Sequence, residues 1–161
     1  MKCISLYQPW ASLVVLGAKR FETRSWERLY RGPLLIHAAK KWNGELKGMC
    51  FDEPFASAIC KARPNRGGEF YLADILDELI PRGAIIGRVR VVKSWRTRGV
   101  SPSISKTEAA FGDYGDGRFA MELSDPAMFE KPIPYRGSQG FFEVPDDVVA
   151  AWINSGKGVR L

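Results

Sequence analysis

Apolar and polar residues alternate along several short segments of the chain, a pattern that predicts strands with one buried face. Residues 2–7 alternate in this way, residues 19–26 follow as a second strand, and residues 33–39 form a third, largely apolar one. The clearest strand is expected over 83–95, where Val89 and Val91 face one side while Arg88 and Arg90 face the other. Residues 118–123 and 132–136 are also expected to be extended.

Short helices are predicted between these strands. Pro9 and the apolar residues after it favour a helix that ends at Gly17. The stretch 42–80 is helical or irregular, with turn-forming residues at 63–68 and an acidic amphipathic helix at 69–80; short helices are also expected at 107–111 and 146–153. Strands and helices alternate poorly and no glycine-rich phosphate loop occurs, which favours an α+β domain over a doubly wound one. We expect a closed or nearly closed β-barrel decorated with short helices.

Length and composition indicate one globular domain covering residues 1–161, because no repeat or linker divides the chain. No run approaches the roughly 20 apolar residues of a membrane span, and no signal peptide is evident, so a cytoplasmic location is expected. The chain has 3 cysteines without C-x-x-C spacing and 1 histidine, His37. This argues against a zinc site, and we expect no metal or cofactor.

Positive charge is concentrated in two stretches. Residues 1–50 hold 9 Lys and Arg against 3 Asp and Glu, so they account for the whole net charge of +6. Residues 81–106 add seven basic residues and no acidic one. Clustering of this kind is typical of proteins that bind an anionic partner, most often nucleic acid. If the two stretches merge into one face, RNA or single-stranded DNA is the expected partner; solvated surface charge is the alternative.

The strand at 19–26 carries the most suggestive chemistry. With a period of two, Arg20, Glu22, Arg24 and Trp26 share one face, while Phe21 faces the core. Glu22 is suited to accept from an amine edge, Arg24 to pair with a phosphate, and Trp26 to stack on a base. A surface ladder of ion pairs would produce the same pattern.

Three consecutive motifs make the chain resemble the ASCH (activating signal cointegrator homology) domain family. They are Ser5-Leu6-Tyr7-Gln8-Pro9-Trp10-Ala11, then Gly17-x-Lys19-x-x-Glu22-x-Arg24, and Tyr30-Arg31-Gly32-Pro33-Leu34-Leu35-Ile36-His37-Ala38. Further matches lie at 111–120 and 134–140. The resemblance covers most of the chain except a variable helical insertion at about 42–80, and the joint motif is specific.

This resemblance implies a PUA-like β-barrel whose cleft, beside the first helix, is lined by Lys19, Glu22 and Arg24. The family is associated with RNA metabolism, transcriptional coactivation and, in some members, nucleic-acid binding or hydrolysis. From the chemistry of the residues, together with this resemblance, we expect ligand contacts from Trp10, Arg24, Trp26, Tyr30, Arg31, Lys40, Asp113, Tyr114, Arg118 and Arg136. Glu108 or Asp113 is an alternative second carboxylate for activating water. His37 is expected to be a hydrogen-bonded core residue rather than an acid or base.

Two other functions stay open. A small bacterial branch of the family deacetylates N4-acetylcytidine with a lysine as base or nucleophile, so Lys19 and Glu22 are candidate catalytic groups of a hydrolase acting on a modified nucleoside or on RNA. That branch has threonine at the position of Glu22. We expect the negative charge of Glu22 to hold Lys19 protonated. The neighbouring Thr23 cannot replace that threonine, because it lies on the opposite face of the strand. The other alternative is a protein-interaction module of the coactivator type.

Overall fold

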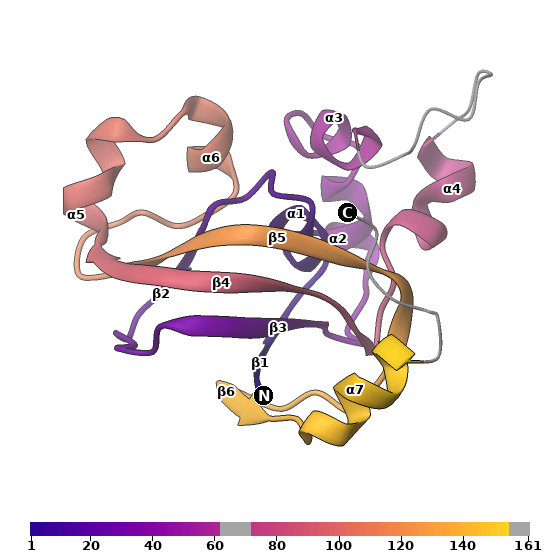
Figure 1. Ribbon diagram of the computed structural model, residues 1–161. Helices are drawn as coiled ribbons and strands as arrows, with labels where there is room; N and C mark the ends of the chain where they lie inside the picture. Colours follow the sequence, from indigo (N-terminus) through magenta and orange to yellow (C-terminus); the bar gives the residue numbers. More distant parts are fainter. Residues whose placement is uncertain (62–71, 155–161) are drawn as a thin grey trace.

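The computed structural model describes residues 1–61 and 72–154. Its centre is one mixed sheet of six strands in the order β2-β5-β4-β3-β1-β6. The sheet curls around α1, as Figure 1 shows. The strands are β1 (Lys2–Leu6), β2 (Phe21–Arg24), β3 (Gly32–Ala38), β4 (Ala84–Arg96), β5 (Phe119–Pro134) and β6 (Phe141–Glu143).

The two longest strands, β4 and β5, lie next to each other in this sheet. β4 and β5 pair antiparallel along most of their length, with register shifts between Ile85 and Gly87, between Arg88 and Arg90, and between Val91 and Lys93. Irregularities of this kind bend a strand and increase its twist, which helps the sheet to curl. β1 lies parallel to β3, whereas its other neighbour, β6, is antiparallel.

The helices are short and gather on two sides of the sheet (Figure 1). They are α1 (Trp10–Val15), α2 (Gly44–Met49), α3 (Phe55–Cys60), α4 (Leu72–Leu79), α5 (Thr97–Val100), α6 (Lys106–Ala110) and α7 (Asp146–Asn154), with a 3₁₀ turn at Ser101–Ser103. No helix in the described ranges is long and apolar enough to cross a membrane.

Helix α1 links the two largest apolar clusters. Val14 and Val15 pack among the apolar residues of the sheet, whereas Leu13 belongs to a second cluster built from α3, α4 and Phe111. The helix ends where Gly17 adopts a φ of +74°, a conformation that glycine reaches without a Cβ penalty. This turn leads the chain directly from α1 to β2, where the candidate site begins.

The fold is α+β, as the sequence predicted, and the strands at 2–7, 33–39 and 83–95 are confirmed within one or two residues at most ends. The second strand is shorter than expected, Phe21–Arg24, and the predicted strands at 118–123 and 132–136 are parts of the single strand β5. The prediction missed β6. The turn predicted at 63–68 and the first residues of the helix predicted at 69–80 lie outside the described residues.

Candidate functional site

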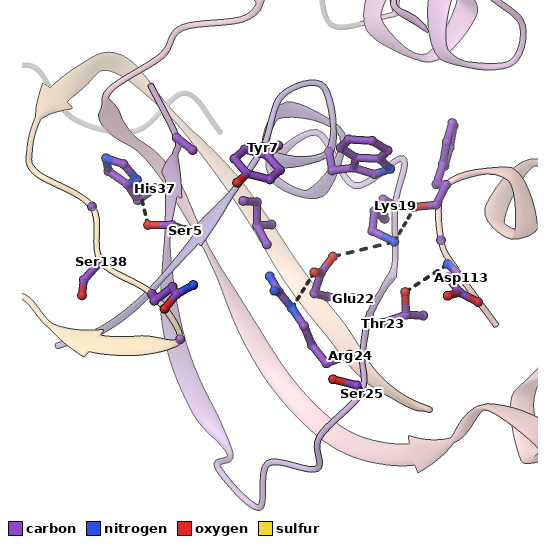
Figure 2. Close-up of a pocket in the computed structure, with 18 of the residues that line it drawn as sticks. Ser5, Tyr7, Lys19, Glu22, Thr23, Arg24, Ser25, His37, Asp113 and Ser138 are labelled. Atoms are coloured by element: carbon purple, nitrogen blue, oxygen red, sulfur yellow. Dashed lines mark hydrogen bonds and ion pairs between the residues drawn. The ribbon is translucent and has the colours of Figure 1, made fainter. Parts of the chain in front are cut away.

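A pocket of about 1250 Å³ opens between the curled sheet and the loops beside it. Figure 2 shows side chains from β1, β2, β3 and two loops converging on it. The loops are the one after α6, which contributes residues 111–113 next to the helix-terminal Ala110, and the one between β5 and β6, which contributes residues 135–140. Segments distant in the sequence thus meet at a single concavity.

Lys19 lies at one wall of the pocket and is 2% exposed. Its backbone N–H donates to the carbonyl of Leu13 in α1, at 3.0 Å, which fixes the residue directly after the helix. Its Nζ donates to the carbonyl of Phe111, at 2.8 Å, and lies 3.8 Å from Oε2 of Glu22. An ammonium group has three donors, so donor capacity remains for a ligand.

Glu22 is 8% exposed and stands between two cations. Its Oε2 faces Lys19, and its Oε1 lies 3.0 Å from Nε of Arg24. The Arg24 contact is ionic rather than a well-directed hydrogen bond, since this Nε has no hydrogen-bond partner by geometry. No hydrogen bond or ion pair joins the terminal guanidinium nitrogens of Arg24 to another described residue, so they can meet an anion, and the carboxylate of Glu22 keeps lone pairs for a ligand donor.

Burial sets the proton affinity of Lys19. Loss of solvation lowers the pKa of its amine below the ordinary 10.5, and this effect exceeds the opposite effect of Glu22 and Glu108, which raise it. The sequence predicted the direction of the Glu22 contribution but not the larger contribution of burial. The resulting group is an amine whose charged form is less favoured than that of a surface lysine.

Most of the residues predicted to be catalytic or to bind a ligand line this pocket: Lys19 and Glu22 of the first group, and Trp10, Arg24, Trp26, Lys40, Asp113, Arg118 and Arg136 of the second. Tyr30, Arg31 and Tyr114 do not. The hydroxyl of Tyr30 donates to the carbonyl of Pro33, and Arg31 donates to the carbonyls of Arg28 and Tyr30, so both stabilise the chain between β2 and β3.

Glu108 and Tyr114 have a structural role instead. The two carboxylate oxygens of Glu108 accept from the backbone N–H groups of Arg20, at 2.8 Å, and Phe21, at 3.1 Å. Oε1 also accepts from the hydroxyl of Tyr114, at 2.9 Å, and burial together with the Glu108 charge raises the Tyr114 pKa. Glu108 is absent from the pocket lining and both of its oxygens accept hydrogen bonds, so Asp113, which lines the pocket, is the better placed of the two carboxylates considered for activating water.

The aromatic residue best placed for stacking is one that the sequence analysis did not select. Trp26 lines the pocket, but the Arg28 guanidinium lies 4.7 Å from the centre of its ring and Phe141 meets it edge-on at 6.2 Å. Tyr7 also lines the pocket and is 49% exposed; the Lys41 ammonium lies 5.3 Å from its ring centre, but no aromatic ring packs against it among the described residues. Its position could have been found from the strand alternation, since Ser5 and Tyr7 face away from the buried Ile4 and Leu6.

His37 is buried and hydrogen-bonded, as expected, yet it also belongs to the pocket lining. Its Nδ1 lies 3.1 Å from Oγ of Ser5, and its Nε2 lies 3.0 Å from the carbonyl of Tyr135. Thr23 likewise lines the pocket, although its hydroxyl accepts from the backbone N–H of Asp113, at 3.2 Å. The strand period alone had placed Thr23 away from this site.

The second basic stretch does not supply charge to the pocket. None of the lysines and arginines of residues 81–106 belongs to its lining. Two of them have acidic partners, since Arg82 lies 2.7 Å from Asp77 and Arg90 lies 3.4 Å from Asp125. The cations of the pocket come from the first third of the chain together with Arg118 and Arg136.

Comparison with known proteins agrees with this architecture. The family model of the ASCH domain matches residues 4–133. The chain belongs to the ASCH domain family. Within this ASCH domain, the loop formed by residues 135–140 lies beyond the matched segment, although it forms one wall of the pocket.

Solved ASCH structures share the fold of this domain. The crystal structure of ASCH from Zymomonas mobilis superimposes with a TM-score of 0.55 over 95% of this chain and 93% of that one, at 13% identity. A point variant of the same protein gives 0.53, also at 13% identity, over 95% of this chain and 96% of its own.

Sequence similarity to curated proteins is local. Human and mouse activating signal cointegrator 1 are each 56% identical to this chain over 39 residues, or 24% of the chain. The matched segment spans only 7% of the length of either cointegrator.

Proposed function

We propose that this ASCH domain binds single-stranded RNA or DNA and receives an unpaired base in the pocket beside α1. The observation that carries the proposal is the joint lining of one pocket by a carboxylate held between cations, exposed Tyr7 and the basic side chains of Lys40, Arg118 and Arg136. Single-stranded nucleic acids are typically bound by cations along the backbone and by aromatic rings that stack on bases.

The pocket contains separate groups for the two parts of a nucleotide. Glu22 can accept a hydrogen bond from an amino group of a base, because its negative charge is compensated by Lys19 and Arg24. Arg24 and the cations of the pocket edge are suited to phosphate. The volume of about 1250 Å³ exceeds the roughly 300–1000 Å³ of typical small-ligand pockets, which favours a base with its flanking nucleotides over a free nucleoside.

One observation favours the hydrolase alternative. Lys19 is a buried amine whose pKa is lowered by desolvation, and buried lysines of this kind serve as bases and nucleophiles. Its neighbour Glu22 is a carboxylate rather than a hydroxyl, and it opposes that effect. We therefore place binding first. Acetyl release from N4-acetylcytidine by the wild type, abolished in Lys19→Ala, would reverse that order.

Fluorescence anisotropy with labelled single-stranded decanucleotides of RNA and DNA tests the proposal. Glu22→Gln should weaken binding about tenfold or more, because the amide supplies one acceptor where the carboxylate supplies two, and it places a donor toward the ligand. Arg24→Ala should weaken both binding and stability, since it removes a phosphate contact and leaves Glu22 with one cation fewer.

Arg98→Ala is the matched control, because it removes the same charge from α5, away from the pocket lining. Its affinity should equal that of the wild type within about twofold. Equal loss of affinity in Arg98→Ala and Arg24→Ala would mean that binding is a diffuse surface effect. No measurable binding of either oligonucleotide by the wild type would overturn the proposed function itself.

A further inference from the structure

The contacts of Ser5 and His37 define a second chemical centre in the pocket, on the side formed by β1 and β3. The two residues are direct neighbours on these paired parallel strands. Figure 2 shows the Ser5 hydroxyl directed at the His37 ring, beside the loop that carries Ser138. Lys19, Glu22 and Arg24, in contrast, are carried by β2 and the turn before it.

The hydrogen bonds of His37 determine where its proton lies. Its Nε2 is 3.0 Å from the carbonyl of Tyr135, and because a carbonyl only accepts, Nε2 carries the hydrogen. Burial lowers the pKa of His37 below 6.5, so the ring is neutral at pH 7 and Nδ1 has a free lone pair. The Ser5 hydroxyl, 3.1 Å away, therefore donates to Nδ1.

We propose that Ser5 is an activated nucleophile and His37 its general base, and that together they form an acyl-transfer centre in this pocket. The arrangement has the parts that such chemistry needs: a hydroxyl, a base within hydrogen-bond reach, and a third group that orients the base. Here the third group is the backbone carbonyl of Tyr135 rather than a carboxylate.

In the proposed reaction, the backbone N–H groups of the loop after Tyr135 are the candidate donors for the oxygen that becomes negative. Gly137 packs directly on the pair: a Cβ at this position would lie 2.6 Å from Oγ of Ser5 and 2.6 Å from Nδ1 of His37. Within the described part of the chain, no backbone N–H of residues 136–139 donates to another group. Backbone amides of this kind stabilise oxyanions in acyl-transfer enzymes.

The reaction follows from these positions. Oγ of Ser5 bonds to the acyl carbon, and its proton passes to Nδ1 of His37. The bond from that carbon to the leaving group then breaks, and the leaving group takes the proton from Nδ1. Water adds to the acyl-serine with His37 again as the base, which releases a carboxylic acid and restores Ser5. Arg24, Lys40 and Arg136 in the lining favour an acyl ester whose remainder is anionic.

A small fluorophosphonate is the direct probe, since it phosphonylates an activated serine and releases fluoride. Intact-mass measurement should show one adduct per chain, and peptide mapping of the wild type should locate it on Ser5. His37→Ala should slow labelling by about a hundredfold or more. Ser25→Ala, which removes another serine of the pocket lining, should label at the wild-type rate.

The pH profile separates base assistance from ordinary serine reactivity. Because His37 is neutral above its lowered pKa, the labelling rate should be flat over about two pH units, from pH 7 to 9, since the base is already deprotonated throughout that range. A rate that rises in proportion to hydroxide, an adduct on another residue, or no adduct would each overturn the proposal. It does not depend on nucleic-acid binding, so failure here leaves the proposed function standing.

Discussion

The charged centre of this pocket consists of Lys19, Glu22 and Arg24, which are linked by two ion pairs through Glu22. Glu22 is almost completely buried, which a carboxylate tolerates only when cations and hydrogen bonds replace its lost solvation. Arg24 provides one such contact, at 3.0 Å, while Lys19 is more distant, at 3.8 Å, and donates chiefly to the carbonyl of Phe111. Lys19 is therefore buried with its closest polar contact to a neutral carbonyl, and its ion pair with Glu22 is the longer of the two contacts.

This burial predicts a specific pH dependence of stability. Between the lowered pKa of folded Lys19 and its ordinary value of 10.5, the unfolded chain holds a proton that the folded chain has lost. Stability therefore rises with pH in that window. The free energy of unfolding of the wild type, minus that of Lys19→Met, should increase by up to about 1.4 kcal/mol per pH unit there.

Urea titrations at successive pH values measure this difference. Lys47→Met, which removes an exposed lysine of α2, is the matched control and should give a difference that is constant over the same range. If the Lys19→Met difference were also constant, or decreased with pH, Lys19 would be protonated throughout and its use as a neutral amine would be excluded.

The site residues divide according to whether a local pattern reveals them. Lys19, Glu22 and Arg24 were found because a short motif with fixed spacing carries them. Ser5 and Tyr7 have a local signal, the period of two along β1, which would have placed them opposite the buried Ile4 and Leu6. The contact of His37 with the Tyr135 carbonyl joins residues 98 positions apart, and no spacing rule gives such a contact.

At the scale of elements, the strands with strong alternation were predictable and those with mixed composition were not. β4 alternates Val and Arg and was placed correctly. The middle of β5, Ser124 to Lys131, contains Asp125 and Pro126, which are typical of turns. The register of β5 against β4 shifts between Ser124 and Ala127, and Asp125 has a φ of +50°, in the left-handed region, so these two residues lie in a bulge. The turn-forming residues therefore interrupt the pairing locally, but β5 continues beyond them because it pairs with β4 on both sides of the bulge.

Gly87 shows how closely these elements approach one another. It lies in β4 at one of the bulges, where an added Cβ would collide with the backbone carbonyl of Ala127 and lie 2.8 Å from Cγ1 of Val15 in α1. The carbonyl belongs to the paired strand β5 and has little freedom to move. The absence of a side chain at this position allows α1 to pack on the sheet, and α1 in turn positions Lys19.

Gly87→Ala should therefore destabilise the domain by about 1–3 kcal/mol, the usual cost of overpacking. For a protein of this size, that corresponds to a fall in Tm of roughly 2–12 °C by calorimetry. Gly99→Ala is the control, because nothing lies within 4 Å of a Cβ at that position of α5. Equal Tm values for the two variants would show that α1 can shift away from the sheet at no cost.

At the scale of the whole molecule, charge is divided between the pocket and the rest of the surface. The first 50 residues carry the net charge of +6, and they supply Lys19, Arg24 and Lys40 to the pocket. Arg118 and Arg136 join them from distant parts of the chain. The sequence could predict the excess charge, but the convergence of these five cations is a property of the fold.

This convergence makes the salt dependence of oligonucleotide binding a test of the whole arrangement. For single strands, the logarithm of the affinity falls with the logarithm of the salt concentration with a slope of about −0.7 per phosphate neutralised. Arg24→Ala and Arg136→Ala should each make the slope shallower by about 0.7, and the double variant by about 1.4, if each contacts one phosphate. Arg98→Ala should keep the wild-type slope, because Arg98 is not part of the pocket lining. A wild-type affinity that does not change with salt would mean that the ligand contributes no phosphate contact, and would leave these cations without the role assigned to them.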